Sequence, residues 1–499
     1  MEHYKFKMAA LALAGLIAAA PLAADEAAPA GDTQDSIEDL RASIGTLTNQ
    51  INSIQSSAKS MIQVHGFAET DVFNDNTQSF TEVVGNGAVK LEGLKASSAG
   101  ANGQTQMSVR NSRIDFLAQA DVNGWKGKGY VEFDLLGYDP SPAWGAASAV
   151  NSAGSTATNA AAAPSEGAFY TNATLRVRHA YLDAQKDGWD IMAGQYWTLL
   201  GWNMDYTLAT VSVAPVMGVL YQRDPQVRLG YTLFGNGPVK IQMAADAERP
   251  VERESSQPNY DQGVRFIIPG WQGRFATATG DAKAVPMSVG ISGDEREFAW
   301  QGTLSNTALS TDTWGKALAI DALVPIIPFD GKDSMSMVAT GEWSVGSGDG
   351  DAFPSWSGGA SALSTTTGAA DVDSGLAYLL GNYKNFTLVQ TTSWNAQLQF
   401  HLMPSIGTFM TVGYGQLKSP NLSNLVGAIN GATGKAVTYG TVYDLDSAEF
   451  VNVMQDFGPN IRAALEFARF YTHYAGNAGN PDGQGAMDNR IQLSTWYRF

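Results

Sequence analysis

The stretch SWNAQLQFHL, residues 393–402, alternates strictly between apolar and polar side chains. Its even-numbered positions carry Trp, Ala, Leu, Phe and Leu, and its odd-numbered positions carry Ser, Asn, Gln, Gln and His. Because successive side chains of a strand point to opposite faces, the stretch predicts a β-strand with one apolar and one polar face. The same alternation recurs at 131–135, 239–246 and 462–467. The sequence therefore predicts many half-buried strands.

The connections between these strands alternate between short and long. Short ones contain turn residues such as Asn123-Gly124 and Asp187-Gly188, whereas long stretches rich in Gly, Ser, Ala and Asn occupy 74–105 and 139–169. Asn-Gly and Asp-Gly favour tight hairpins. Short turns at one end and long loops at the other are typical of an outer-membrane β-barrel.

The fold class that we expect is an all-β transmembrane β-barrel of about sixteen antiparallel strands at 62–499, with fourteen or eighteen strands left open. The eighth and ninth strands, placed at 259–268 and 283–291, are the weakest, because their connection is long for a periplasmic turn. A β-sandwich or a propeller is the alternative, but the apolar faces of those folds surround a dry core. The many charged polar faces here favour a closed barrel with a wet lumen.

The last nine residues, IQLSTWYRF (491–499), predict the strand that closes the barrel against the one beginning at Ile62. One of its faces carries Ile, Leu, Thr, Tyr and Phe, and the other carries Arg, Gln, Ser, Trp and Arg. The aromatic end falls where a periplasmic girdle is expected, with the apolar face toward lipid. A terminal Phe also resembles the signal that the barrel-insertion machinery reads. The residues expected to serve closing and assembly are Trp496, Tyr497 and Phe499.

The N-terminal part predicts two segments outside the barrel. Residues 1–24 have the charge, the apolar run and the small residues of a secretory signal peptide. Residues 25–61 predict a periplasmic coiled-coil segment, because apolar residues recur at alternating spacings of three and four. The alternative is one helix packed on its own domain, and the core residues alone do not decide between two and three strands. The predicted core is Ile37, Leu40, Ile44, Leu47, Ile51 and Ile54.

The composition excludes several kinds of site. The chain has no cysteine, so disulfides and thiolate metal sites are ruled out. A formal net charge of −17 argues against nucleic acid as a partner. There is no HExxH or GxSxG motif, and we predict no catalytic residue, metal centre or cofactor. Acidic segments at 347–351 and 444–446 lack the ligand spacing of an EF-hand, and calcium binding there is left open.

Four short motifs, taken in order, resemble those of the DcaP-like porins of Gram-negative outer membranes. They are VHGFA (64–68), NSRIDFLAQAD (111–121), the passage from RVRHAYLDA to GWDIMAGQYW (176–197) and the closing WYRF (496–499). The resemblance spans the mature chain and implies a trimeric sixteen-stranded barrel with a three-stranded periplasmic coiled coil. It implies outer-membrane lipid, lipopolysaccharide and the barrel-insertion machinery as partners. It also implies passive uptake of small, often anionic solutes such as dicarboxylates.

A diffusion channel needs a constriction with fixed charges rather than a nucleophile or a cofactor. We therefore expect pore-lining residues at the polar positions of the strands, where arginines attract carboxylates and bind them bidentately. The alternative is that these arginines pair with lumen carboxylates such as Glu132 and Asp134 and only keep the lumen wet. The candidate pore-lining and selectivity residues are Arg113, Asp115, Arg176, Arg178, Tyr196, Asp205, Arg223, Asp224, Arg228, Arg462 and Glu466.

The stretch 198–225, after the fifth strand, is unusually apolar for an external loop. Porins fold the corresponding loop into the lumen, where it narrows the channel, so the resemblance implies that Asp205, Arg223 and Asp224 face the passage. The alternative is a loop at the contact between trimer subunits.

The leading functional prediction is a porin, not an enzyme, for passive diffusion of small hydrophilic solutes, anions among them. One alternative is a structural outer-membrane protein that tethers the envelope through its coiled coil. A weaker one is an outer-membrane hydrolase, which requires a Ser, a His and an acid to converge on the outer wall.

Overall fold

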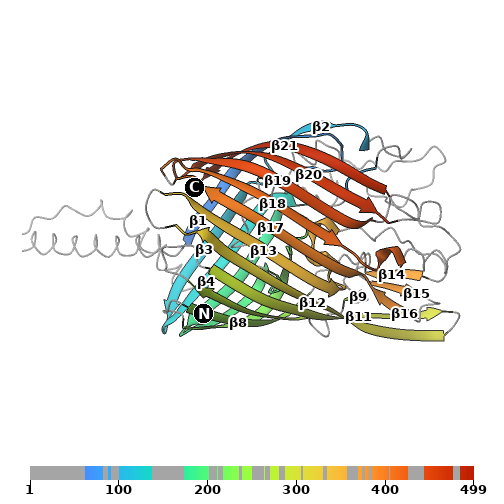
Figure 1. The fold of residues 1–499 in the computed structure, drawn as a ribbon. Helices are drawn as coiled ribbons and strands as arrows, with labels where there is room; N and C mark the ends of the chain where they lie inside the picture. The colour runs from blue at the N-terminus through green and yellow to red at the C-terminus, as the bar shows by residue number, and fades with distance from the viewer. Residues whose placement is uncertain are drawn as a thin grey trace, which may run out of the picture. The chain divides into compact units, whose positions relative to one another are not determined.

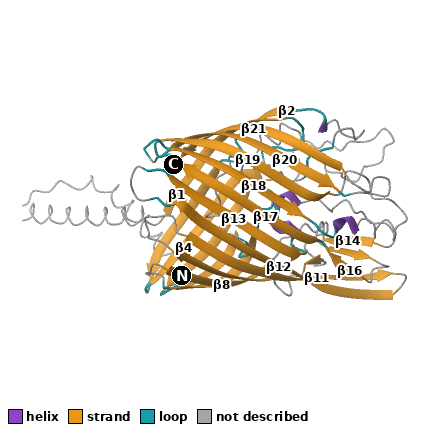
Figure 2. Cartoon of the chain, viewed as in Figure 1, coloured by secondary structure: helices purple, strands orange, loops and turns teal. Residues whose placement is uncertain are grey.

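In the computed structural model nearly all of the regular structure is β-strand (Figure 2). The signal peptide and the coiled-coil core predicted at 1–61 lie outside the described residues, and within those residues no helix is long and apolar enough to span a membrane. The structure describes residues 62–82, 88–91, 100–137, 174–201, 211, 217–234, 239–249, 263–264, 270–279, 287–304, 307–329, 334–356, 369–373, 377–380, 385–403, 405–424, 443–475 and 484–499.

The strands close into an antiparallel barrel, as the sequence predicts. β1 (Ile62–Asp75) pairs with β21 (Gln484–Arg498), which joins the two ends of the sheet (Figure 1). The sheet contains eighteen strands, but β2 (Gln104–Ser108) and β3 (Arg113–Val122) share one position because both pair with β1. The two-residue β9 (Gly263–Val264) only flanks β11. The barrel therefore has the predicted sixteen strand positions.

The other barrel strands follow in chain order, and each pairs with the next. They are β4 (Trp125–Gly137), β5 (Thr174–Lys186), β6 (Trp189–Trp197), β7 (Arg223–Leu233), β8 (Val239–Glu248), β10 (Gly270–Thr279), β11 (Met287–Leu304), β12 (Thr307–Ile327), β13 (Ser336–Ser347), β17 (Gln390–His401), β18 (Thr408–Lys418), β19 (Tyr443–Phe457) and β20 (Ile461–Tyr474). Between β13 and β17 lie two 3-10 turns and a separate small sheet that the sequence did not predict. These are η3 (Gly350–Ala352), η4 (Pro354–Trp356), β14 (Ala369–Asp373), β15 (Ala377–Leu380) and β16 (Asn385–Leu388).

The prediction for the eighth strand, 259–268, is wrong. The eighth position is β10, which is paired along its whole length with β8 and with β11. Its sequence, GWQGRFATAT, contains two glycines and little contrast between apolar and polar positions, so it was interpreted as a connection. Two paired neighbours supply hydrogen bonds to a segment whose own strand pattern is weak. β11 also extends well past its predicted end.

Two tight turns confirm the expected hairpin chemistry. Asn123 and Gly124 have φ of 52° and 79°, and Asp187 and Gly188 have φ of 50° and 88°. Two consecutive positive φ values define the turn that matches the twist of a two-residue hairpin. These turns lie at the end of the barrel where β1 begins and β21 ends (Figure 1).

The faces of the strands are inverted relative to a soluble protein. In β17, Trp394 is 42% exposed on the outside, whereas Ser393, Asn395 and Gln397 are buried on the inside. In soluble domains large apolar side chains are the buried ones. The closing strand behaves in the same way, because Tyr497 is exposed and Gln492 is fully buried. The predicted apolar and polar faces are thus confirmed, with the polar face toward the lumen.

The described residues of the connection between β6 and β7 lie inside the lumen. Their backbone N–H groups donate hydrogen bonds to inward side chains of three distant strands: Gly201 to Ser292 Oγ on β11 (2.8 Å), Leu220 to Glu342 Oε1 on β13 (3.0 Å) and Val211 to Glu466 Oε2 on β20 (2.9 Å). The described residues of 198–225 therefore lie inside the barrel and not on its outer surface. We call the described residues of this connection, 198–201, 211 and 217–222, the inserted segment.

An apolar cluster fixes the inserted segment against one half of the wall. Met217 and Leu220 belong to the same buried cluster as Phe450 and Phe470, which face inward from β19 and β20. The loop between β1 and β2 contributes Phe80, whose ring contacts that of Phe470 at 5.2 Å. The remaining members come mainly from the loop after β13 and from β12, β18 and β20. Described residues of several loops therefore pack against the inward side chains of this part of the wall.

Candidate functional site

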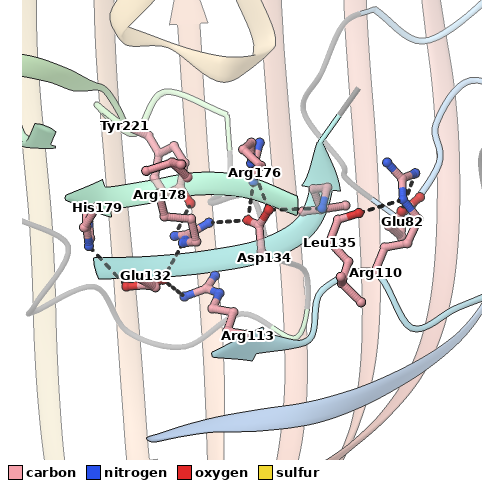
Figure 3. A network of polar contacts seen from close by, with 12 residues as sticks. Glu82, Arg110, Arg113, Glu132, Asp134, Leu135, Arg176, Arg178, His179 and Tyr221 are labelled. Atoms are coloured by element: carbon pink, nitrogen blue, oxygen red, sulfur yellow. Dashed lines mark hydrogen bonds and ion pairs between the residues drawn. The ribbon is translucent and has the colours of Figure 1, made fainter. Parts of the chain in front are cut away.

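Two carboxylates on β4 form the centre of the candidate site. Glu132 and Asp134 are two positions apart, so both point into the lumen. Asp134 accepts two hydrogen bonds from Arg176, from Nε at 3.0 Å and from Nη2 at 2.6 Å. Arg178 bridges the two carboxylates, with Nε 2.5 Å from Glu132 Oε1 and Nη1 3.0 Å from Asp134 Oδ2 (Figure 3). Charge-assisted bonds of this kind hold both arginines in defined positions.

A β-bulge in β5 brings two adjacent side chains to this site. Glu132 is opposite His179 and Phe133 is opposite Val177, so Arg178 is the extra residue. A bulge re-aims side chains that strict alternation would place on opposite faces. Arg178 and His179 are both buried, and His179 Nδ1 lies 3.1 Å from Glu132 Oε2. The sequence did not predict His179 as a site residue. Strict alternation places it on the face opposite to Arg178, and only the bulge brings the two adjacent side chains to the same site.

The arginines around these carboxylates differ in their access to the lumen. The side chain of Arg178 is 2% exposed, whereas those of Arg113 on β3 and Arg176 are 26% and 34% exposed. Arg113 Nη1 lies 3.6 Å from Glu132 Oε1, which is an ion pair but not a close hydrogen bond. Arg178 therefore serves as a buried support, whereas Arg113 and Arg176 retain partly exposed guanidinium groups.

The end of the inserted segment completes the cluster. The hydroxyl of Tyr221 accepts a hydrogen bond from Arg178 Nη2 at 3.2 Å. The guanidinium of Arg223 lies 4.9 Å from the ring centre of Trp197 and 5.5 Å from that of Tyr221. Four guanidinium groups thus surround two carboxylates, since Arg223 and Arg113 interact electrostatically with Arg178 and with Asp134. We call Arg113, Glu132, Asp134, Arg176, Arg178, Tyr221 and Arg223 the arginine cluster.

The neighbouring strands β6 and β7 extend the cluster. The ring of Tyr196 lies 4.9 Å from that of His179, and the guanidinium of Arg228 lies 5.7 Å from the Tyr196 ring. Arg228 Nη2 donates to the carbonyl of Trp197 and to Gln226 Oε1, at 2.5 and 2.6 Å, and lies 3.6 Å from Asp246. Asp224 is buried on β7, in register with Tyr196.

Asp115 lies beside the arginine cluster, in register with Glu132 on β4, and its Oδ1 lies 3.1 Å from Nδ1 of His65 on β1. The remaining predicted pore residues lie elsewhere. Arg462 forms a two-pronged pair with Asp456, at 2.7 and 2.9 Å, next to the turn between β19 and β20. Glu466 holds Val211 of the inserted segment on the far wall. Asp205 lies outside the described residues.

A second charged group lies at the loop end, around β11 and the loop after β13. Arg296 donates to Asp294 Oδ2 at 3.0 Å and to Asp351 Oδ2 at 2.8 Å. Asp349 accepts hydrogen bonds from the Thr391 hydroxyl at 2.6 and 2.8 Å. Burial raises the pKa of Asp349 to about 7, although Thr391 and Arg296 oppose the shift. Within the part of the chain that the structure describes, no three acidic or histidine side chains are grouped to hold a metal ion.

Comparisons with known proteins give one informative likeness. No family model and no curated protein matches the sequence. The crystal structure of the outer membrane channel DcaP of Acinetobacter baumannii is similar over 88% of this chain and 97% of that chain, with a TM-score of 0.56 and 16% identity. An anion-selective porin from Comamonas acidovorans (TM-score 0.47, 8% identity, 88% and 99% covered) and the trimer form of OmpT from Vibrio cholerae (0.45, 11%, 88% and 99%) are more distant. The chain thus has the fold of the DcaP channel, and the resemblance to DcaP-like porins is confirmed at the level of the fold.

Proposed function

We propose that this chain is an outer-membrane porin, a channel for passive diffusion of small hydrophilic solutes with a preference for anions such as dicarboxylates. The observation that carries the proposal is the arginine cluster, which lies inside a closed barrel whose outward faces are apolar. A membrane strand needs an outward apolar band and an inward polar face, which is the arrangement of these strands. In the outer membrane the short turns then face the periplasm and the long loops face outward.

The geometry supports a specific division of work among the arginines. Arg178 neutralises Glu132 and Asp134 and holds their side chains in place. Arg113 and Arg176 retain lumen-exposed guanidinium surface, and a planar guanidinium fork matches a carboxylate. The inserted segment approaches from the other side through Tyr221 and narrows the passage. A solute carboxylate is therefore attracted to this level of the lumen without any bond being made or broken.

The proposal includes partners. Three copies are expected to assemble, with residues 25–61 as a periplasmic coiled coil and residues 1–24 removed on export. Two exposed aromatic residues, Tyr497 at the end of β21 and Phe499 just after it, support contact with lipid and recognition by the barrel-insertion machinery. Lipopolysaccharide would surround the loop half of the barrel.

The test is conductance of the purified full-length protein in planar lipid bilayers. We expect the conductance to rise in steps of three channels, one step for each inserted trimer. In a salt gradient the reversal potential should indicate a preference for anions. The double variant Arg113→Ala, Arg176→Ala should shift that potential toward cations, because two partly exposed positive charges of the lumen are lost. The variant Lys316→Ala is a control, since Lys316 is two-thirds exposed in a pair with Glu295 on the outer wall. Absence of channels would reject the porin, and an unchanged potential would reject these arginines as its selectivity residues.

A further inference from the structure

Three polar side chains stand on the outer wall among apolar ones. Glu449 on β19, Arg469 on β20 and Asn489 on β21 occupy outward positions and are in register with one another. Arg469 donates from Nη1 to Glu449 Oε1 and from Nε to Asn489 Oδ1, both at 3.1 Å. The side chains of Glu449 and Arg469 are 52% and 45% exposed. An exposed ion pair contributes little to stability, so stability does not explain why these charges face outward.

The row of Glu449, Arg469 and Asn489, which we call the polar row, marks one edge of the apolar band. On the side of the short turns, the next outward residue of β20 is Phe467 and that of β21 is Ile491, and both are exposed. On the other side, the next outward residue of β20 is Tyr471. Aromatic girdles flank the apolar band of a transmembrane barrel. The polar row therefore lies where hydrocarbon gives way to headgroups, on the side away from the short turns.

A groove in the outer wall reaches the polar row. It spans β13, β17, β18, β19 and β20, which are neighbours in the sheet (Figure 1), and its volume is about 660 Å³. Ala339 and Ala396 contribute only methyl groups, so the wall is low there. Leu398 and Val412 are larger apolar residues of the lining, and Glu449 is its charged residue. The groove is thus apolar along the wall and charged where it meets the polar row.

The groove and the polar row together match an amphiphile. A hydrocarbon chain that lies in a hollow gains dispersion contacts on more than one side. A guanidinium group binds phosphate oxygens through its planar set of N–H donors. Arg469 uses Nε and Nη1 for Asn489 and Glu449, and among the described residues its Nη2 has no partner. Its two neighbours therefore hold Arg469 beside the groove with a donor left for an anion.

A second outward ion pair provides a comparison. Lys316 Nζ on β12 lies 2.9 Å from Glu295 Oε1 on β11, and both side chains are exposed. The flanking outward residues of β12 are large, because Trp314 and Leu318 stand on either side of Lys316. Lysine also presents a point charge and not a planar fork. This pair offers an outward charge without alanines beside it on its strand.

We propose that the groove and Arg469 form a binding site for a phosphorylated lipid of the outer leaflet, with a hydrocarbon chain over Ala396 and a phosphate group at Arg469. The occupant is lipid A, the phosphorylated anchor of lipopolysaccharide, because the polar row lies at the leaflet away from the periplasmic turns. The inference rests on the proposed outer-membrane porin, and it adds to that proposal a defined lipid site on the outer wall.

Native mass spectrometry of the full chain in detergent tests the site, with diphosphoryl lipid A as the probe. We expect the wild type to retain this lipid and Arg469→Ala to weaken its binding about tenfold. Lys316→Ala also removes one outward positive charge and should leave the binding unchanged. Equal weakening in both variants would overturn the proposal. Equal retention of dephosphorylated lipid A, or of phosphatidylglycerol, would also overturn it.

A matched pair of bulky variants tests the groove. Ala396→Trp fills the hollow, whereas Ala322→Trp places the same indole on the outer face of β12. Only Ala396→Trp should weaken the binding of lipid A, by severalfold. If it does not, or if it changes the number of subunits instead, the groove is not a lipid site.

Two further measurements separate this inference from the porin proposal. Heat-dependent migration on denaturing gels checks that each variant folds as a barrel. Conductance in planar bilayers should be unchanged, because all the altered side chains lie on the outer wall. Conducting channels that bind lipid A no better than its dephosphorylated form would reject the lipid site and leave the porin proposal intact.

Discussion

The inward faces of β4–β5 and of β19–β20 belong to the same barrel and obey the same alternation, yet they are built differently. On β4 and β5 the inward positions hold Asp134 and Arg178 in a network of ion pairs. On β19 and β20 they include Phe450 and Phe470, which the inserted loops bury. Alternation determines which side chains point inward. Inward side chains that pack against loops are apolar, whereas those of the ion-pair network are charged. The inner surface of one barrel can therefore contain both a charged wall and an apolar wall that is covered by loops.

Removing a carboxylate from the charged wall should have the largest effect. Asp134→Ala leaves Arg176 without its two-pronged partner and the buried Arg178 with one carboxylate. Loss of one partner from a buried ion pair costs about 3–5 kcal/mol. We expect a loss of this order in the free energy of unfolding, measured by urea titration of the barrel in detergent. The exposed pair Lys316–Glu295 is the reference, since Lys316→Ala should cost less than about 1 kcal/mol. Equal losses in the two variants would contradict the buried network.

The pH dependence of the loop end should be the next largest effect. The folded-state pKa of Asp349 is about 7, above its ordinary value of 3.8, so folding favours the protonated form. The stabilisation is complete below pH 3.8 and is lost as the pH rises through 7. Between pH 5 and pH 8 the loss is on the order of 2–3 kcal/mol. The measurement is the difference in unfolding free energy between the wild type and Asp349→Asn at these two pH values. A difference that does not change with pH would show that Asp349 does not titrate in this range.

Displacing the inserted segment from the apolar wall should have a smaller energetic effect and a clear functional one. A Cβ on Gly415 of β18 would overlap the carbonyl oxygen of Met217. Gly415→Val should cost about 1–3 kcal/mol through overpacking. It should also raise single-channel conductance, because the segment is pushed away from the wall. Gly293→Val is the matched control, since its nearest neighbour, the Ala317 carbonyl, is 3.4 Å away. Unchanged conductance in Gly415→Val would mean that this segment does not narrow the channel.

Much of this barrel can be predicted from the sequence, because the alternation of apolar and polar residues identifies both the lipid-facing and the lumen-facing side of a membrane strand. The alternation at 393–402, the turns at Asn123-Gly124 and Asp187-Gly188, and the count of sixteen follow from local pattern. β10 was missed because its strand state comes from its two neighbours and not from its own pattern.

The candidate site was predicted only in part. The alternation of inward and outward positions predicted Arg176 and Arg178 as lumen residues. It also gave Glu132 and Asp134 as their possible partners, because all four stand at alternate positions of strands. Tyr221 was not predicted, because its position follows from the inserted segment, whose described residues lie inside the barrel. Arg462 and Glu466 also occupy inward positions, but they lie far from the cluster. Alternation gives the face of a strand, and not the position of a residue along the barrel axis or around its circumference.

The pairing of β1 with β21 has a consequence for how this protein is made. The ion pair between Asp75 and Arg490 joins residues 415 positions apart, and Asp71 accepts a hydrogen bond from Gln492 across the same seam. Until the ribosome has produced β21, the edge of β1 has no such partner, and an unpaired edge invites the wrong one. The barrel can therefore close only after nearly all of the chain has been synthesised.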